Sequence, residues 1–149
     1  MPEPTTAAAP AALHWRLLAA LYDLLPALAL WFTTAAVVLL LRGGETVTPD
    51  SVGAWLQLAS MAGVGFGYYG LSWRRGGQTL GMRAWRLRLV HASGQVPPWR
   101  AVLLRYLVAG VSLGAFGLGF LWSLWDPQRR SWHDLASGTR LLRLPRSTL

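Results

Sequence analysis

The sequence predicts an all-α integral membrane protein with three hydrophobic helical segments, of which the third is bent or re-entrant. A small basic connector and tail, arranged like a β-hairpin on the cytoplasmic side, complete this prediction. Hydrophobic residues make up 53% of the 149 residues and charged residues only 13%, which is too apolar for an ordinary soluble domain. Residues 13–41 are apolar over a longer stretch than the roughly 20 residues that cross a bilayer. All 14 basic residues are arginine, and they cluster beside the hydrophobic segments.

The formal net charge of +8 narrows the range of expected partners. Because the arginines flank hydrophobic segments, they favour the anionic cytoplasmic leaflet of the lipid bilayer as their partner, and nucleic acid is not expected. The chain has no cysteine, which excludes disulfides, thiol catalysis and cysteine-ligated zinc. The three histidines share no metal-ligand spacing, and no serine nucleophile with an elbow motif accompanies them. We therefore expect no metal, no cofactor and no enzymatic activity.

A single domain accounts for nearly all of the chain. Residues 1–12 are rich in Pro, Thr and Ala and are expected to form a disordered N-terminal tail. The transmembrane domain is expected over residues 13–144. Residues 145–149 are expected to form a short C-terminal tail.

The first hydrophobic segment carries two ionisable residues and a proline. Arg16 and Asp23 lie seven residues apart and therefore on one face of a helix. Pro26 cannot donate a backbone hydrogen bond, and it crowds and frees the carbonyl of Tyr22. A carboxylate beside a free carbonyl is the beginning of an oxygen site for a proton or a small hard cation. The alternative is a structural ion pair, in which Asp23 binds Arg16 or Arg105.

The second hydrophobic segment covers about residues 52–73 and contains a G-x-x-x-G pair, Gly63 and Gly67. Small residues four apart allow two helix backbones to approach closely in lipid. The alternative interpretation is a permeation pathway. We favour tight packing of these glycines against the first segment.

The connector over residues 74–100 contains six arginines and no acidic residue, which places it in the cytoplasm by the positive-inside rule. Residues 85–89 alternate between apolar and arginine side chains, a pattern typical of a β-strand. Residues 139–144 form a second strand candidate, which is able to pair with the first if both lie on the same face of the membrane.

The third hydrophobic segment, residues 101–125, is rich in glycine and is therefore easily bent. Two of its glycines, Gly110 and Gly114, are also expected to pack against another helix. Three plain crossings would place the connector and the arginine-rich tail on opposite sides of the membrane, against the charge rule. We therefore expect this segment to be bent or re-entrant and to return the chain to the cytoplasm.

These residues give the chain a resemblance to the RDD family of small bacterial membrane proteins, which is named for one arginine and two aspartates. The family's arginine falls on Arg16 and its first aspartate on Asp23, in the sequence HWRLLAALYD. Its second aspartate falls on Asp134, in WHDLASGT. The family's Gly-x-Thr-x-Gly connector motif matches the segment that contains Thr79 and Gly81.

The match covers nearly the whole chain after the N-terminal tail, and Met82 stands where the family usually has lysine. The resemblance implies a multi-pass protein of the bacterial inner membrane. It also implies a role in transport, with sodium/proton exchange as one form of that role.

Two functions are compatible with the sequence. The first is a transporter of ions or small solutes, in which Asp23 titrates while Arg16 and Asp134 set its environment. Three short segments enclose little space, so a transporter would have to form a homo-oligomer. The alternative is a non-catalytic interaction or assembly subunit that docks a larger membrane protein.

The second aspartate, Asp134, also has two interpretations. In the first interpretation, Asp134 is only a turn residue whose hydrogen bonds are satisfied, since it lies close to Arg129 and Arg130 in the sequence. If the tail folds back to the amino-terminal side of the domain, Asp134 instead contacts Arg16.

Overall fold

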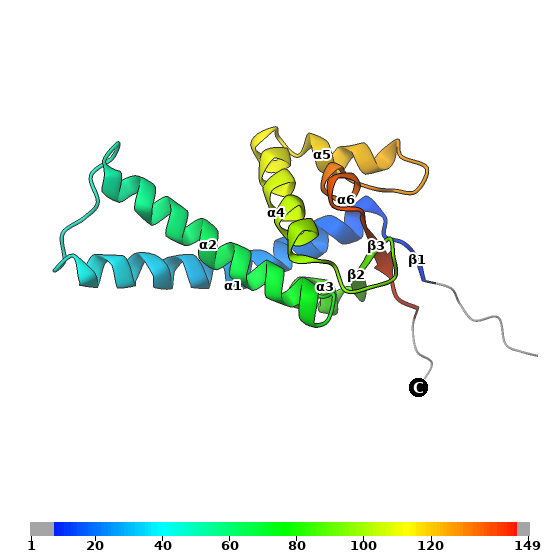
Figure 1. The fold of residues 1–149 in the computed structure, drawn as a ribbon, viewed down its shortest axis with the longest axis horizontal. Coiled ribbons are helices and arrows are strands. Elements are labelled where there is room, and N and C mark those ends of the chain that lie inside the picture. The colour runs from blue at the N-terminus through cyan, green and yellow to red at the C-terminus, as the bar shows by residue number, and fades with distance from the viewer. Residues whose placement is uncertain (1–7, 146–149) are drawn as a thin grey trace, which may run out of the picture.

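The computed structural model describes residues 8–145 (Figure 1). The elements, in chain order, are β1 (Ala9–Pro10), α1 (Leu13–Leu41), α2 (Val52–Arg75), α3 (Leu80–Ala84), β2 (Leu87–His91), α4 (Trp99–Gly114), α5 (Leu118–Leu121), the short 3-10 helix η1 (Trp122–Leu124), α6 (Trp132–Ser137) and β3 (Thr139–Arg143). The first segment predicted from the sequence therefore forms one continuous helix with the expected bounds.

Helix α1 is mostly exposed, and its buried residues form a single narrow stripe: Arg16, Ala19, Asp23 and Ala27. These positions recur every three or four residues, which places them on one helix face. Pro26 lies within α1 without ending it. Exposed leucines cover the rest of the surface, including Leu25, which is 72% exposed. The helix thus buries one stripe against the rest of the protein and leaves an apolar surface exposed, as expected of a helix that lies in lipid.

Among the described residues, α1 is the one helix that is long and apolar enough to cross a membrane by itself. Helix α4 and the α5–η1 segment meet the same criterion only together, as a broken span or a re-entrant loop. Helix α2 has 24 residues but does not meet it, because its glycines and polar side chains dilute its apolar content. The expected three hydrophobic segments thus reduce to one clear span and one bent candidate.

The third segment is sharply bent, as its glycine content indicated. The axes of residues 99–114 and 118–124 differ by 108°. Phe116 and Gly117 both adopt positive φ angles, of 56° and 77°, and thereby reverse the chain between α4 and α5. The α5–η1 segment then leads back toward α6 and the sheet (Figure 1).

The two strand candidates are paired, but they do not form a hairpin. β2 and β3 run antiparallel, with Leu87 opposite Arg143 and His91 opposite Thr139. The chain between them contains α4, α5 and α6, so their pairing is a long-range contact. The sheet also has a third strand, in the order β1-β3-β2.

Strand β1 corrects part of the expected disordered tail. Ala9 and Pro10 pair with β3, and the Ala11 N–H donates to the Leu141 carbonyl at 2.9 Å. The free edge of β3 offers backbone groups that need partners, and these residues supply them. Residues 1–7 and 146–149 lie outside the described residues, so the rest of the expected tails is not tested.

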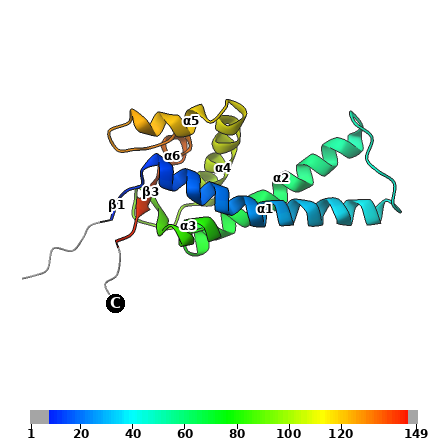
Figure 2. The same cartoon turned by 180° about the vertical axis from the view of Figure 1, so that it is seen from behind.

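The sheet, α3 and α6 lie together at one end of the molecule, and the loop between α1 and α2 lies at the other (Figure 2). Connector and tail are therefore neighbours. The two long helices are joined by the Trp31 Nε1–H, which donates to the Met61 carbonyl at 3.1 Å, and they diverge toward their connecting loop.

The glycines expected to pack between helices do not do so within the chain. A Cβ added at Gly63, Gly67, Gly110 or Gly114 would meet nothing within 4 Å. The packed glycines of α2 are instead Gly65, where such an atom would lie 2.7 Å from the Tyr106 hydroxyl, and Gly70, where it would lie 3.1 Å from the Trp99 ring. Two residues correspond to about 200° around a helix, so Gly63 and Gly67 point away from the face that meets α4.

Candidate functional site

The centre of the folded end is Asp134, which is 1% exposed and held by two arginines. The Arg16 Nη1–H donates to Asp134 Oδ2 at 2.6 Å. Arg105 donates to the other carboxylate oxygen, Oδ1, through its own Nη1–H. The backbone N–H and the hydroxyl of Ser131 complete the shell, with donor–acceptor distances of 3.1 and 2.9 Å to Oδ2. We call Arg16, Arg105, Ser131, Asp134 and Thr139 the Asp134 cluster.

The local sequence positions this carboxylate. At the start of α6, the Asp134 carboxylate accepts both the backbone N–H and the hydroxyl of Ser131, which is the residue that precedes the helix. The Ser-x-x-Asp spacing is visible in the sequence, so the capping role of Asp134 could have been predicted from it.

The two arginines connect the Asp134 cluster to every major element. Arg16 also donates to the carbonyls of Ala11, at 3.1 Å, and Arg129, at 2.7 Å. Arg105 donates to the Thr139 hydroxyl at 2.8 Å, and its guanidinium carbon lies 5.2 Å from the Trp73 ring centroid. Helices α1, α2, α4 and α6 and strand β3 are thereby joined through one buried ionic centre.

The electrostatics of the cluster leave it with excess positive charge. Burial alone would raise the pKa of the Asp134 carboxyl, but Arg105 and Arg16 outweigh burial and hold that pKa well below its usual range. Burial lowers the pKa of neighbouring His133 to about 3, and the positive charge of Arg105 adds to this effect. Near neutral pH the centre therefore contains two cations, one anion and a neutral imidazole.

The second buried carboxylate, Asp23, is 3% exposed and occupies a separate site. Three donors surround it: the Tyr68 hydroxyl at 2.8 Å, the Gly81 N–H at 2.9 Å and the Thr79 hydroxyl at 2.5 Å. All three groups are electrically neutral, and within residues 8–145 no ion pair forms to Asp23. We call these four residues the Asp23 site.

Gly81 brings the connector into contact with α1. A Cβ at this position would lie 2.0 Å from the Ala19 carbonyl oxygen and 3.0 Å from the Asp23 Cγ, so only glycine fits the approach. Thr79 caps α3 by accepting the Met82 N–H at 3.2 Å while its hydroxyl donates to Asp23. The Met82 sulfur in turn accepts the Thr79 N–H. Methionine at position 82 is thus part of a buried cap.

The structure separates residues that the sequence placed together. Arg16 and Asp23 share a face of α1, but neither Arg16 nor Arg105 pairs with Asp23, because both bind Asp134. The structural ion pair proposed for Asp23 is therefore wrong. The contact between Arg16 and Asp134 is present, since the bent third segment returns the tail to the start of α1.

Tyr68 is a site residue that the sequence analysis missed. Within the tyrosine pair of α2, Tyr68 faces Asp23 and also accepts the Leu80 N–H at 3.2 Å. No local pattern distinguishes it from Tyr69. Only the packing of α2 against α1 and α3 decides which tyrosine reaches the carboxylate.

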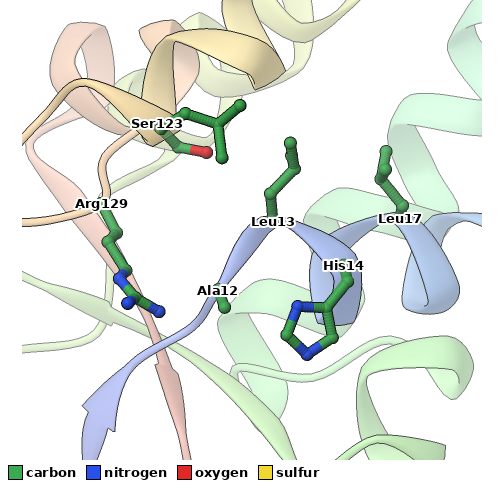
Figure 3. Close-up of a pocket in the computed structure, with 7 residues that line it drawn as sticks. Ala12, Leu13, His14, Leu17, Ser123 and Arg129 are labelled. Atoms are coloured by element: carbon green, nitrogen blue, oxygen red, sulfur yellow. The ribbon is translucent and has the colours of Figure 1, made fainter.

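Two cavities of about 480 Å³ each flank the Asp134 cluster. The first lies between the start of α1 and η1, and its lining includes His14, Ser123 and Arg129 (Figure 3). The second is bounded by the sheet and includes Arg16 and Arg140. Neither cavity is lined by Asp23. Among the described residues, no cluster of three or more His, Asp or Glu side chains is able to hold a metal ion.

The comparison with known families agrees with this constellation of one arginine and two aspartates. Residues 10–138 match the model of the RDD family, a range that contains both buried carboxylates. No curated protein and no solved structure matches the chain. The protein therefore belongs to the RDD family of membrane proteins, with α1 as its candidate membrane-spanning helix.

Proposed function

We propose that this protein is a multi-pass inner-membrane carrier of ions or small solutes, in which Asp23 is the ion-binding group. The observation that carries the proposal is the isolation of Asp23: it is buried in the candidate span, and its contacts are neutral donors. A charge at the centre of a bilayer costs about 2.5–3.5 kcal/mol on insertion scales. A carboxylate kept there without a counter-ion is suited to exchange a proton or a small cation.

The division of the arginines supports this assignment. Because Arg16 and Arg105 are both engaged by Asp134, they are not available to neutralise Asp23. The first aspartate of the family motif is thus left without a cationic partner among the described residues, while the second binds both arginines. Sodium/proton exchange, which the family resemblance implies, is the specific reaction that we propose to test.

In the proposed topology, α1 crosses the membrane, the less apolar α2 returns across it beside α1, and α4–α5 enters it as a re-entrant loop. The sheet and connector 74–100 then lie in the cytoplasm. Its support is the concentration of arginine at the sheet end and the pairing of β2 with β3, which keeps connector and tail together. Since the chain has no native cysteine, single cysteines report its sidedness cleanly. An impermeant thiol reagent on intact cells should label Thr48→Cys and spare Ser93→Cys; the reverse pattern would overturn this topology.

A carrier requires access to Asp23, and neither of the two cavities provides it. We therefore propose that the working unit is a homo-oligomer. The open glycine faces of α2 (Gly63 and Gly67) and α4 (Gly110 and Gly114) are its contact surfaces. Gly67→Leu should reduce the oligomer size in mild detergent.

One observation favours a second candidate, a non-catalytic assembly subunit. The three donors at Asp23 are supplied by α2 and the connector, so the carboxylate also serves as an internal fastener. In that case the open faces of α2 and α4 dock a larger membrane protein.

Ion flux in proteoliposomes separates the two candidates. Wild-type protein should support pH-dependent cation flux, and Asp23→Asn, which preserves the size of the side chain, should abolish it while remaining folded. Arg75→Gln, which removes an exposed charge that does not contact Asp23, serves as the matched control and should retain flux. Wild-type vesicles without flux under sodium, potassium and proton gradients would favour the assembly subunit.

A further inference from the structure

The first cavity combines positive charge with an apolar wall. Its lining consists of Ala12, Leu13, His14, Leu17, Ser123, Leu124 and Arg129. In the view of Figure 3, the side chains of His14 and Arg129 extend to one side of the α1 start, and those of Leu13 and Leu17 extend to the other. The cavity is therefore amphipathic, with its two cationic or imidazole side chains apart from its leucines and with Ser123 on the leucine side.

The Asp134 cluster holds the residue that supplies the charge. The Arg129 carbonyl accepts a hydrogen bond from the Arg16 Nη2–H at 2.7 Å, and Arg129 adopts a left-handed φ of 54°. Its guanidinium makes no hydrogen bond or ion pair to another described residue. The adjacent Arg130, by contrast, is bound by Asp126 at 3.0 Å. The backbone of Arg129 is thus anchored while its cationic group stays available.

The surroundings favour an anion. The buried centre behind the cavity holds two arginines against one aspartate, and its excess charge has the same sign as Arg129. The first turn of α1 contains no acidic residue, and its N-cap, Ala12, provides no side-chain acceptor for the free N–H groups. Such a helix start attracts a negative group, which here meets a guanidinium as well.

The apolar wall identifies the rest of the ligand. Leu17 and Leu124 are 50% and 62% exposed, and exposed leucines continue along α1 at Leu21 and Leu25. This track is long and open enough for a hydrocarbon chain. Trp125, which follows the lining residue Leu124 in the chain and is 73% exposed, is a residue type that concentrates where membrane meets water. A membrane interface at Trp125 would place the charged part of the cavity at the depth of lipid headgroups.

We propose that this cavity binds an anionic glycerophospholipid, with its phosphate at Arg129 and His14 and an acyl chain along Leu17 and Leu124. The proposal does not depend on ion transport; it shares with the proposed function only the placement of α1 in a membrane. The cluster that contains the family's arginine and second aspartate then has a further role: it positions a lipid-binding residue.

The test measures the thermal unfolding of the full chain in neutral detergent during titration with phosphatidylglycerol, phosphatidylcholine or inorganic phosphate. Phosphatidylglycerol should raise the unfolding midpoint more than phosphatidylcholine does, and inorganic phosphate should have no comparable effect. Arg129→Gln should weaken the apparent affinity for phosphatidylglycerol about tenfold, as expected for the loss of a charge-assisted contact. Arg75→Gln, an equal loss of charge at an exposed position outside the cavity, should not.

Further variants separate the remaining outcomes. His14→Gln probes the same phosphate position without touching the Arg129 backbone, so the test survives if Arg129→Gln fails to fold. Leu17→Ser should weaken lipid binding through the acyl wall. The proposal would be overturned if wild type, Arg129→Gln and His14→Gln all bound phosphatidylglycerol with equal affinity. The proposal would also be overturned if inorganic phosphate raised the unfolding midpoint as much as phosphatidylglycerol does. Loss of the phosphatidylglycerol effect in Arg140→Gln would overturn it as well, because that result would place the anion in the second cavity.

Discussion

Arg16 and Asp134, which are separated by 118 positions in the chain, form a buried ion pair in which Nη1 and Oδ2 lie 2.6 Å apart. The pair joins the first turns of the candidate membrane span to the short helix that precedes β3. It is able to form only because the bent third segment brings the tail back to α1. The arginine and the second aspartate of the RDD motif are thus partners in folding.

Asp134→Asn is expected to destabilise the protein strongly. The substitution removes the one anion that compensates two buried guanidinium groups, and an uncompensated buried charge typically costs about 3–5 kcal/mol. The midpoint of thermal unfolding in mild detergent measures this loss. The matched control is Asp50→Asn, which removes an exposed carboxylate that forms no ion pair within residues 8–145 and should change the midpoint little. Similar effects of the two substitutions would contradict the central role of Asp134.

Gly81→Ala is expected to detach the connector from α1. Its new Cβ would lie 2.0 Å from the Ala19 carbonyl oxygen, so α3 must shift and the N–H bond to Asp23 is weakened. The loss of stability should resemble that of an overpacked core, about 1–3 kcal/mol. Gly76→Ala is the control, since a Cβ at that position would meet only the end of the Arg83 side chain, at 3.8 Å, and the φ angle of Gly76 is negative. If Gly81→Ala left the stability of the protein unchanged, α3 would be free to move away from α1.

Tyr68→Phe tests the donor shell of Asp23 without changing the packing volume. Loss of a hydrogen bond to a carboxylate should cost about 1.5–3 kcal/mol, measured as the change in unfolding free energy. Tyr69→Phe is the matched control, because the Tyr69 hydroxyl makes no hydrogen bond to another described residue. If the two variants unfold alike, Tyr68 does not hold Asp23 in the membrane.

His133 is expected to make stability fall in acid. Its pKa in the folded protein is about 3, below the ordinary value of 6.5, so the unfolded chain binds a proton that the folded chain excludes between these values. Stability from this residue is therefore complete above pH 6.5 and declines as the pH drops toward 3. At pH 5 the loss is on the order of 2 kcal/mol. His133→Gln should flatten the difference between unfolding midpoints at pH 7 and pH 5, relative to wild type. An unchanged pH dependence would show that His133 is protonated in place.

Hydrophobic length and local chemistry predicted much of the fold. The end of α1 was predictable because a long apolar run stops at Arg42 and Gly43. The bend of the third segment was predictable from its glycines and from the arginines on either side of it. Alternating side chains predicted a strand over residues 85–89, whereas β2 begins two residues later, at Leu87; the second candidate, residues 139–144, matches β3 closely. The third strand was not predictable, since Ala9–Pro10 has no strand pattern and is recruited by the open edge of β3.

The sequence alone determined which residues are buried ionisable groups and which helix face they occupy, because helical periodicity and the cost of exposed charge in lipid are local properties. Only the tertiary structure decided their partners. Both arginines bind Asp134, and Asp23 is held by neutral donors from α2 and the connector. The physical reason is that hydrogen bonds and ion pairs depend on distances of about 3 Å between segments far apart in sequence. Those distances are set by the bend after α4 and by the close approach of Gly81 to α1, which no single stretch of the chain contains.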